Sequence, residues 1–426
     1  MKFLQHLTLL GLIAIYTPIT SAEELNIDIT KAFETTVPIA VVPFGSNSSL
    51  PVDVSAVVQA DLSRSGYFKT LAEAEMLSKP SSPNEIVFRN WQILGQEYLL
   101  IGKIQPMGGS YQIFFQLLDV SKGEQIMDYK ITSEANGLRR AAHQISDLVY
   151  AKLTGNKGVF GTKVAFVSSS GEIDNKVYKL QIADVDGYNA AAIVSSQEPI
   201  MSPAWSPDGK KIAYVSFENH RAAIFIQILA TGQRIKIASY RGINGAPAWS
   251  PDGRKLALTL SKGGSPDIYI LNLASKQLTQ LTRSAAINTE PTWSPDGQTI
   301  VFTSSQSGKP QLYKISSNGG NPHRLTMRGD YNANASFSPD GSKLVMVHAN
   351  GGSYKIAIMN LASGSLNVLT SGSLDESPSF SNNGSMVLYA ARKGNRGILS
   401  AVSIDGRIKQ KLEFQNPEVR EPAWAP

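Results

Sequence analysis

The fold is decided by Pro203-Ala204-Trp205-Ser206-Pro207-Asp208-Gly209, a stretch that recurs along the second half of the chain. Full copies begin at Pro247, Pro291 and Ala335, a degraded copy begins at Pro378, and the chain stops inside a sixth copy. The successive starts lie 44, 44, 44, 43 and 44 residues apart. An internal repeat of about 40–45 residues is the period of a β-propeller blade.

Each period contains the same series of short strands. After one motif come the strand-like runs Thr299–Thr303 and Gln311–Ile315, and a short fourth run follows near 324–326. Gly, Pro and Asn residues separate these runs, as expected for turns between strands. The sequence therefore predicts four antiparallel strands in every repeat.

The motif residues have a mechanical explanation. Pro-Asp-Gly combines a fixed φ, a side-chain acceptor and a residue that tolerates positive φ, so it predicts a tight turn between the first two strands. One aromatic residue stands before the turn in every repeat, where it can pack against the neighbouring blade. Turn chemistry and ring packing therefore account for the repeated Asp and aromatic residues better than catalysis or ligand binding does. The aromatic positions are Trp205, Trp249, Trp293, Phe337, Phe380 and Trp424.

Counting strands gives the number of blades. Three strand-like runs (163–168, 177–182 and 190–194) precede the first motif without an innermost strand of their own. The last residues, Pro422-Ala423-Trp424, supply one innermost strand with nothing behind it. We expect these pieces to form one blade, which closes a six-bladed ring and removes two exposed sheet edges.

A different domain is expected over residues 23–158, because the repeat is absent there. Residues 38–43 resemble a buried strand, and three β-rich runs (98–104, 111–119 and 125–132) resemble a meander. Apolar spacing predicts helices over 52–64 and 138–153. This is an α/β domain followed by an all-β propeller over 159–426, with 155–161 as the connecting segment.

The composition and the N-terminus indicate export. The 426 residues include no Cys, which excludes disulfides, thiol catalysis and Cys-ligated metals. Residues 1–22 have the charged start, apolar centre and small-residue end of a signal peptide. An uncleaved anchor is the alternative, but the apolar run is too short to span a bilayer. We expect an exported protein that does not insert in a membrane after cleavage.

No residue pattern for catalysis, for a metal or for a cofactor is present. The five His residues lack metal-binding spacing, and neither a Gly-x-Ser-x-Gly elbow nor a phosphate-binding Gly-rich loop occurs. Lys and Arg (40) only slightly outnumber Asp and Glu (34), without a basic run that would favour nucleic acid. Carboxylates brought together by different blades remain open as an alternative that would make the protein a hydrolase or lyase.

The segments just before each motif are the candidate binding site. Each joins the outer strand of one blade to the inner strand of the next, so all should gather at one mouth of the ring. Loops grouped on a rigid scaffold often bind partners, although plain solvated loops are the alternative. The candidate residues are Asn244, Gly245, Ala246, Thr289, Glu290, Asn332, Asn334, Asp375 and Glu376.

A second candidate segment follows the predicted cleavage point. Glu24 begins a stretch in which Leu25, Ile27 and Ile29 alternate with polar residues. Such a stretch could add to a sheet as an edge strand, or detach and bind a partner. The sequence leaves both possibilities open.

The whole chain resembles the TolB family of the Tol–Pal system. The resemblance rests on the export signal, the Trp-Ser-Pro-Asp-Gly repeats, Val41-Val42-Pro43-Phe44 and the stretch Ser63-Arg64-Ser65-Gly66-Tyr67-Phe68. The repeats alone are less specific, because peptidase and lyase propellers share them.

The resemblance implies a periplasmic adaptor without enzymatic activity or cofactor. In the family, the propeller mouth binds the outer-membrane lipoprotein Pal, and the mature N-terminal segment binds the inner-membrane protein TolA. Matching the motifs places Pal-facing positions at Asn244, Gly245, Ala246, Thr289 and Glu290, whereas Ile243 departs from the polar residue expected there. The TolA-binding segment would extend from Glu24 to about Thr35. The system supports outer-membrane integrity and constriction in cell division.

Overall fold

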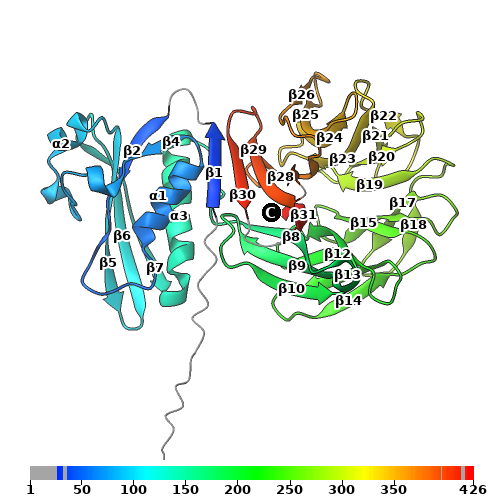
Figure 1. The fold of residues 1–426 in the computed structure, drawn as a ribbon, viewed down its shortest axis with the longest axis horizontal. Coiled ribbons are helices and arrows are strands. Elements are labelled where there is room, and N and C mark those ends of the chain that lie inside the picture. Colours follow the sequence, from blue (N-terminus) through cyan, green and yellow to red (C-terminus); the bar gives the residue numbers. More distant parts are fainter. Residues whose placement is uncertain (1–25, 32–35, 395, 414–417) are drawn as a thin grey trace, which may run out of the picture.

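A six-bladed β-propeller follows an N-terminal α/β domain, as the repeat predicted (Figure 1). The computed structural model describes residues 26–31, 36–394, 396–413 and 418–426. The signal peptide predicted over residues 1–22 and the candidate residues Glu24 and Leu25 lie outside the described residues. None of the described helices combines the length and the apolar character that crossing a membrane requires.

The N-terminal domain is built on one mixed sheet with strand order β4-β2-β5-β6-β7. The predicted meander is present as β5 (Tyr98–Met107), β6 (Ser110–Asp119) and β7 (Glu124–Glu134). The predicted buried strand is β2 (Val37–Val41), which runs parallel to both of its neighbours, β5 and β4 (Phe68–Thr70). A two-residue strand, β3 (Gly45–Ser46), also pairs with β5.

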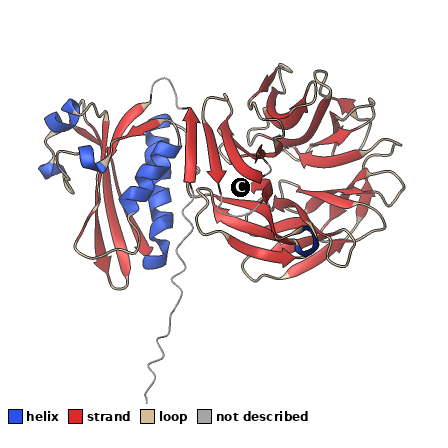
Figure 2. Cartoon of the chain, in the orientation of Figure 1, coloured by secondary structure: helices blue, strands red, loops and turns tan. Residues whose placement is uncertain are grey.

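Two helices cover one face of this sheet (Figure 2). The predicted helices are α1 (Val54–Arg64), capped by the Asp53 side chain, and α3 (Leu138–Thr154), which ends at Gly155 with φ 74°. Their apolar faces join the inner side chains of the sheet in one core, as the spacing predicted. The short helix α2 (Phe88–Ile93) was not predicted, and its Trp91 lies in a second core with Leu99 and Leu118. Single 3₁₀ turns occur at η1 (Glu73–Glu75), η2 (Pro83–Glu85), η3 (Ala135–Gly137) and η4 (Ile173–Asn175).

The propeller blades are antiparallel sheets that follow one another around the ring. Blades two to five each begin with an inner strand that ends in the repeated turn. Blade two has β11 (Ile200–Trp205), β12 (Lys211–Ser216), β13 (Ala223–Ile228) and β14 (Arg234–Ala238). Blade three has β15 (Asn244–Trp249), β16 (Lys255–Leu260), β17 (Asp267–Asn272) and β18 (Leu278–Gln280). Blade four has β19 (Asn288–Trp293), β20 (Thr299–Ser304), β21 (Gln311–Ser316) and β22 (His323–Arg324). Blade five has β23 (Tyr331–Phe337), β24 (Lys343–Ala349), β25 (Tyr354–Asn360) and β26 (Leu366–Val368).

Blades one and six complete the ring with strands from the chain ends. In blade one, the C-terminal β31 (Glu418–Trp424) pairs with β8 (Lys163–Ser170), so the predicted closure is confirmed. The same sheet continues through β9 (Val177–Asp184) and β10 (Ala191–Ser196). Blade six has β27 (Glu376–Phe380), β28 (Met386–Lys393), β29 (Arg396–Ser403) and β30 (Lys409–Glu413), and β1 (Asn26–Lys31) adds a fifth strand beside β30.

Three of the repeated aromatic residues, Trp205, Trp249 and Trp293, donate a hydrogen bond to the blade before their own. The Nε1–H of Trp249 donates to the Ala204 carbonyl oxygen at 3.0 Å, and that of Trp293 donates to the Ala248 carbonyl oxygen at 3.1 Å. Trp205 makes the corresponding bond to the Ala423 carbonyl oxygen at 3.0 Å. The rings thus pack between inner strands, as predicted, and their donors are satisfied there.

The repeated Asp residues hold the turns, also as predicted. In the first copy, the Ser206 hydroxyl donates to Asp208 Oδ1 at 2.6 Å, and the Lys210 N–H donates to the same oxygen at 3.0 Å. Gly209 has φ 65°, which a residue with a Cβ adopts only at a cost. The copies that contain Asp252, Asp296 and Asp340 repeat these contacts.

Candidate functional site

The segments predicted as mouth loops are in part strand. Asn244, Gly245 and Ala246 begin the inner strand β15, and Asn332 and Asn334 lie in β23. Each inner strand carries a bulge near its start, where the pairing register with the second strand shifts. A bulge redirects side chains and bends the strand. The residues in question therefore sit on a fixed backbone instead of on free loops.

One residue in each bulge has a left-handed backbone. Its φ lies between 45° and 54° in all six blades, although none of these residues is Gly. Such a conformation is rare for residues with a Cβ and persists only where the surrounding structure holds it. We call these positions the bulge residues: Ser202, Ala246, Glu290, Asn334, Ser377 and Glu421.

All six bulge residues line a central channel of about 1020 Å³. We call the part of the channel that they surround the mouth. The inner strands of the six blades contribute its wall, together with Tyr331 and Tyr354. Four acidic residues, Glu290, Asp375, Glu376 and Glu421, share this lining with one guanidinium, of Arg420. The channel wall is therefore acidic near the mouth.

Two of these carboxylates accept a hydrogen bond from the backbone of the next blade, and the donor is the equivalent residue in both cases. Glu290 Oε2 accepts hydrogen bonds from the Asn334 N–H at 2.9 Å and from the Thr303 hydroxyl at 2.8 Å. Glu421 likewise accepts a hydrogen bond from the Ser202 N–H. In both cases the donor is the bulge residue that follows in the ring. These side chains therefore connect neighbouring blades as well as line the channel.

The crowding of acids perturbs the channel residues. Burial and repulsion from Glu376 and Glu290 raise the pKa of Glu421 to about 7. The Ser202 N–H and the positive charge of Arg420 lower this pKa, but the effects that raise it are larger. Burial and the nearby Glu290 raise the pKa of Tyr331 to about 12. Near neutral pH the Glu421 carboxyl group therefore exists in both charge states.

Three predicted partner-binding side chains are buried and already have partners. Asn244 bonds to the backbone of Tyr240 and Gly242, and it is 2 % exposed. Asn332, 0 % exposed, bonds to Gln311. Asp375 accepts a hydrogen bond from the Thr370 hydroxyl. The expectation that these three side chains face a partner is therefore corrected: they fix the strand starts from inside.

Repetition in the sequence carried a signal for this inner network. Leu281-Thr282, Leu325-Thr326 and Leu369-Thr370 recur at intervals of 44 residues. In the structure each Thr hydroxyl accepts a hydrogen bond from the backbone of the third strand, and it donates to a buried polar side chain. The recurrence of these Thr residues is therefore a sequence signal that the neighbouring Asn and Asp side chains lie in the interior.

The other predicted mouth residues remain accessible. Gly245, Ala246, Thr289, Glu290, Asn334 and Glu376 are half-buried. All of them except Gly245 and Thr289 line the channel, and Gly245 and Thr289 line a groove beside it. The structure thus brings these six residues to one opening of the ring.

The groove extends outward from the mouth between blades two and three. It encloses about 450 Å³ and shares Met201, Ser202, Ala246 and Glu290 with the channel. Met201, Tyr240 and Ile243 expose apolar surface there. Met201 and Ile243 belong to the segments before the motifs, whereas Tyr240 was not predicted. Arg221 and Arg241 belong to the same lining and are exposed, and Lys262 lies 4.7 Å from the Tyr240 ring. The groove is therefore apolar with a basic rim.

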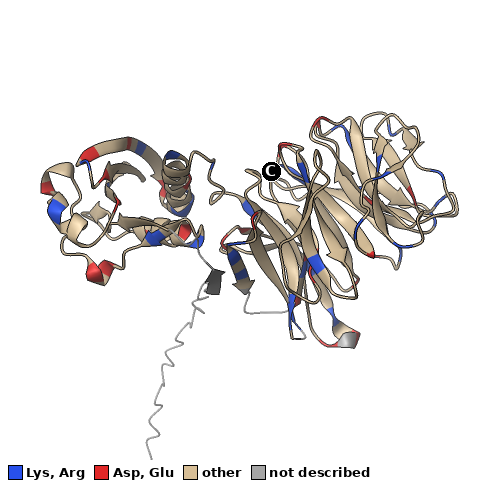
Figure 3. Cartoon of the chain, turned by 90° about the horizontal axis from the view of Figure 1, so that it is seen from above, with Lys and Arg blue, Asp and Glu red and all other residues tan. Residues whose placement is uncertain are grey.

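The second predicted segment lies on the propeller. Ile27 pairs with Leu412 and Ile29 pairs with Gln410, so β1 is an edge strand of blade six. In Figure 1, β1 stands between the helices of the N-terminal domain and blade six. Figure 3 shows Lys, Arg, Asp and Glu residues on both domains, with the two signs interspersed.

One further group of titratable residues lies between the two domains. Asp61, His143 and Asp186 place their ligand-type atoms within 4.8 Å of one another, the only such group of three or more in the described part of the chain. Arg64 and Arg139 already pair with these two carboxylates. Two guanidiniums at this distance oppose the binding of a cation, so the group does not resemble a metal site.

The channel offers limited means for catalysis. A carboxyl group with a pKa near 7 suits general acid–base chemistry, but the channel lining contains no His among the described residues. The hydroxyls of Ser202, Thr292 and Ser336 in that lining therefore lack an imidazole base.

Comparisons with known proteins place the whole chain in one group. A family model described as "TolB amino-terminal domain" matches residues 25–126, and one described as "TolB beta propeller domain" matches residues 150–426. The Tol-Pal system protein TolB of Methylococcus capsulatus is 63% identical over 403 residues, which is 95% of this chain and 94% of that protein. The protein of the same name from Xanthomonas euvesicatoria is 52% identical over 427 residues, covering 98% and 97% of the two chains.

Solved structures agree with this grouping. The crystal structure of TolB from Acinetobacter baumannii is 42% identical, with a TM-score of 0.88, and the match covers 95% of this chain and 100% of that one. A chain of the nidogen/laminin complex is 16% identical, with a TM-score of 0.51 over 62% of this chain and 99% of its own length. At that identity the second match shows the propeller fold alone.

Proposed function

The chain belongs to the TolB family of Tol-Pal system proteins, and from that premise we propose that it is a periplasmic protein-binding adaptor without enzymatic activity. Its propeller mouth would bind the outer-membrane lipoprotein Pal, and its N-terminal segment would bind the inner-membrane protein TolA. The complex would support outer-membrane integrity and constriction in cell division. No cofactor and no nucleic acid takes part in this proposal, although other envelope proteins could bind as well.

The observation that carries the proposal is the groove that opens from the mouth. Three exposed apolar side chains, those of Met201, Tyr240 and Ile243, lie together beside the channel and line a groove of about 450 Å³. Apolar surface with a charged rim is typical of protein interfaces. The basic rim, with Arg221 and Arg241, suits a partner surface that carries acidic side chains.

The N-terminal strand supports the second half of the proposal. β1 is joined to the propeller along one edge only, through the pairs from Asn26–Glu413 to Lys31–Lys409. A segment held this way can exchange between a docked strand and a free peptide. If a partner at the mouth prefers one of these states, binding at the mouth changes the availability of the segment.

The mouth can be tested by calorimetric titration of residues 23–426 with a soluble Pal domain. We expect saturable 1:1 binding, weakened at least about tenfold by Ile243→Asp, because a buried apolar contact at an interface centre typically contributes this much. Val368→Asp is the matched control: Val368 and Ile243 are both 48 % exposed, but Val368 lies on the outer strand β26 of blade five. The control should bind as the unmodified protein does.

Two results would contradict this half of the proposal. One is the absence of binding at high micromolar Pal with both proteins folded. The other is equal weakening by Ile243→Asp and Val368→Asp, which would remove the groove from the interface. Glu290→Lys is a less clean probe, because the Glu290 carboxylate also binds the next blade.

The N-terminal half of the proposal is tested by hydrogen exchange. Amides of residues 26–31 should change their exchange rate when Pal is bound, because the docked and free states differ in backbone pairing. Identical exchange with and without Pal would contradict the coupling. TolA binding to residues 23–426, compared with a chain that begins at residue 36, tests the segment itself.

The alternative, a hydrolase or lyase, has one specific observation in its favour. Glu421, with its pKa near 7, shares the channel with Glu290 and Glu376. An enzyme of this kind should lose activity with Glu421→Gln and tolerate Ile243→Asp. An adaptor should show the reverse pattern in binding.

A further inference from the structure

Four successive loops at the mouth end of blades three to five form a continuous band. Two are hairpin loops within a blade, 261–266 and 305–310, and two join neighbouring blades, 281–287 and 325–330. Strand pairing places them at the mouth end, because β16 ends opposite the start of β15 and β20 ends opposite the start of β19. The two connecting loops lead directly into the starts of β19 and β23. We call these four loops the band.

Polar contacts join each loop of the band to the next. The Ile287 N–H donates to the Ser305 hydroxyl oxygen at 2.9 Å, and the N–H of the following residue donates to the Pro266 carbonyl oxygen at 2.9 Å. Lys309 Nζ lies 3.1 Å from Asp330 Oδ1. The loops therefore lie side by side along the rim of the ring.

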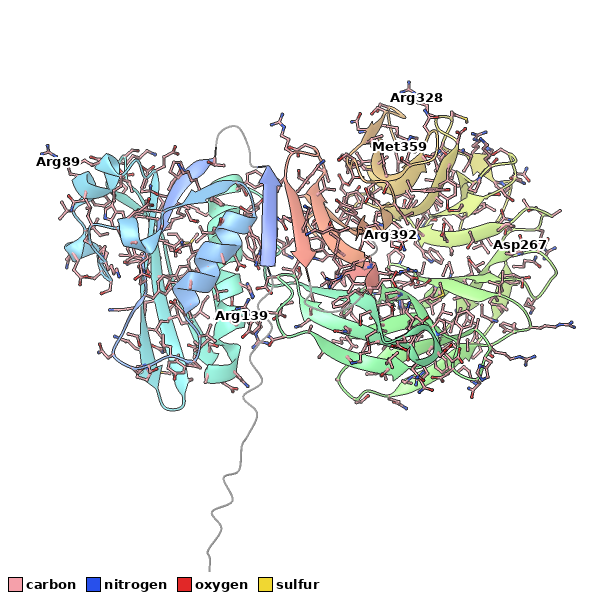
Figure 4. The ribbon with its side chains drawn as sticks, in the orientation of Figure 1. Arg89, Arg139, Asp267, Arg328, Met359 and Arg392 are labelled. Carbon is pink, nitrogen blue, oxygen red and sulfur yellow. The ribbon has the colours of Figure 1, made fainter. Side chains whose placement is uncertain are left out.

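Every loop of the band carries one basic residue. Asp330 is the one acidic residue in the four loops, all of which the structure describes. Apart from the pair of Lys309 with Asp330, these cations form no ion pair with the described residues. Figure 4 labels Arg328, whose side chain points away from the blades. The band is therefore strongly basic, through the exposed residues Lys262, Arg283, Lys309 and Arg328.

Two large apolar side chains are exposed among these cations. Ile287 is 54 % exposed, and it shares a loop with Arg283. Met327 is 72 % exposed, and Arg328 follows it directly in the chain. Neither apolar side chain lines the channel or the groove. The band thus combines exposed cations with exposed apolar side chains outside the site described above.

This combination fits the surface of an anionic bilayer. Anionic headgroups attract Lys and Arg, and an apolar side chain that enters the headgroup layer is removed from water. The cations are spread one to a loop, and none of them lines the channel or the groove. A bilayer presents many negative charges without a fixed pattern, so it requires no matching cavity. The carboxylates of the mouth lie in the channel wall, whereas the cations of the band are exposed.

We infer that the band is a peripheral docking surface for an anionic phospholipid bilayer. The four cations attract the headgroups, while Ile287 and Met327 enter the headgroup layer. The contact is peripheral, since it uses only side chains of loops. It does not depend on the adaptor proposal, because the band lies outside the groove and the channel.

Sedimentation with phospholipid vesicles tests this inference. Residues 23–426 are mixed with vesicles of phosphatidylcholine, with or without phosphatidylglycerol. We expect binding only to the vesicles that contain phosphatidylglycerol, and weaker binding at high salt, because ions screen exposed charges. The double variant Arg283→Gln with Arg328→Gln should lower the partition coefficient about fivefold for each cation removed.

A matched control separates the band from the net charge of the protein. Arg254→Gln with Arg407→Gln removes the same number of charges from exposed residues. These two residues lie in turns at the opposite ends of blades three and six, so this variant should bind nearly as the unmodified protein does. Ile287→Ser with Met327→Ser keeps every charge and should weaken binding at both low and high salt, because salt does not screen apolar contacts.

Three results would overturn the inference. The first is the absence of binding to vesicles that contain phosphatidylglycerol, and the second is equal binding to vesicles without it. The third is equal weakening by the band variant and its control, which would reduce the effect to net charge. Loss of Pal binding in the band variant, without any vesicle binding, would assign the band to an acidic protein surface instead. The vesicle test contains no partner protein, so its failure would leave the adaptor proposal standing.

Discussion

The two ends of the six inner strands differ in how they use repetition. At one end, the Ser-Pro-Asp-Gly turn repeats the same contacts, as Ser206 with Asp208 and Ser250 with Asp252 show. At the other end, the bulge keeps the same backbone conformation in every blade but carries different side chains. Glu290 and Ala246 occupy the same place in neighbouring blades, although one is acidic and the other has a single methyl group.

This difference separates the scaffold from the recognition surface. Residues that only build the ring must satisfy the same geometry in blade after blade, and therefore they repeat. Residues at the mouth keep the backbone that the ring imposes and are free to differ in charge and size. Changes that disturb the repeated contacts should therefore lower stability, whereas changes at the mouth should alter binding and can also raise stability.

The largest effect should come from the aromatic position. Trp293→Ala should lower the free energy of unfolding by about 3–5 kcal/mol, because it leaves a cavity between blades three and four. Urea unfolding followed by fluorescence or circular dichroism measures this loss. Trp293→Phe is the control: it keeps the ring and removes only the bond to Ala248, so it should cost about 1 kcal/mol. The chain itself places Phe337 and Phe380 at this position. If Trp293→Ala lowered the free energy of unfolding by less than about 1 kcal/mol, the aromatic residues would not be important for packing between blades.

The next effect concerns the mouth and depends on pH. Because burial, Glu376 and Glu290 raise the pKa of Glu421 from 4.5 to about 7, folding favours its neutral form. The stabilisation that the neutral Glu421 carboxyl group adds to the folded state is fully present below about pH 4.5 and is lost as pH rises through 7. Glu421→Gln keeps an acceptor for the Ser202 N–H and should therefore be more stable than the unmodified protein at pH 8, by about 1–3 kcal/mol. Urea unfolding at about pH 5 and pH 8 compares the two. An equal pH dependence in both proteins would show that the carboxylates do not interact.

A smaller effect of opposite sign belongs to the turn. The hydroxyl groups of Ser338 and Ser342 lower the pKa of Asp340 from 3.8 to about 2. The stabilisation that the ionised Asp340 carboxylate adds to the folded state is therefore present above pH 3.8 and is lost as pH falls toward 2. Asp340→Asn should remove this dependence at a cost of at most about 1 kcal/mol near pH 7, because the turn is exposed to solvent. Asn383 already holds the equivalent turn of the degraded repeat. Unfolding midpoints of the unmodified protein and of Asp340→Asn between about pH 2.5 and pH 6 test the prediction. The same loss of stability at low pH in both proteins would contradict it.

The smallest effect compares two alanines of one strand. Ala246→Gly should raise stability by about 0.5 kcal/mol, because Gly relieves the positive φ of 45°. Ala248→Gly, two residues on and outside the left-handed region, should lower stability by about 0.5–1 kcal/mol. A higher melting temperature for Ala246→Gly and a lower one for Ala248→Gly would confirm that the backbone is strained at the bulge. Equal losses would show that no strain is stored there.

The sequence predicted the fold well because the propeller is local and repetitive. Turn residues, the aromatic position and the alternation of strands recur within each period, so every blade repeats the same information. The closing strand followed from counting, since three strand-like runs lacked an inner strand and β31 supplied it. In the N-terminal domain the long helices α1 and α3 followed from apolar spacing, whereas the six-residue α2 was too short for such a pattern.

The candidate site was predicted only in outline. Its place on the ring followed from the topology, but which side chains face outward did not. Asn244, Asn332 and Asp375 have the composition of surface residues, and yet they bond inside the blades. The apolar residues Met201 and Tyr240 have no feature in the sequence that marks them as exposed.

By itself, the sequence determined the six blades and the turn chemistry, because these depend on residues close together in the chain. The ring closure pairs β31 with the distant β8, but it followed from counting the strands of the repeat. The tertiary structure decided the acidic channel, the docking of β1 on blade six and the meeting of Asp61, His143 and Asp186. Each of these joins residues tens to hundreds of positions apart. Burial and charge at such places depend on how whole elements pack, which no local pattern specifies.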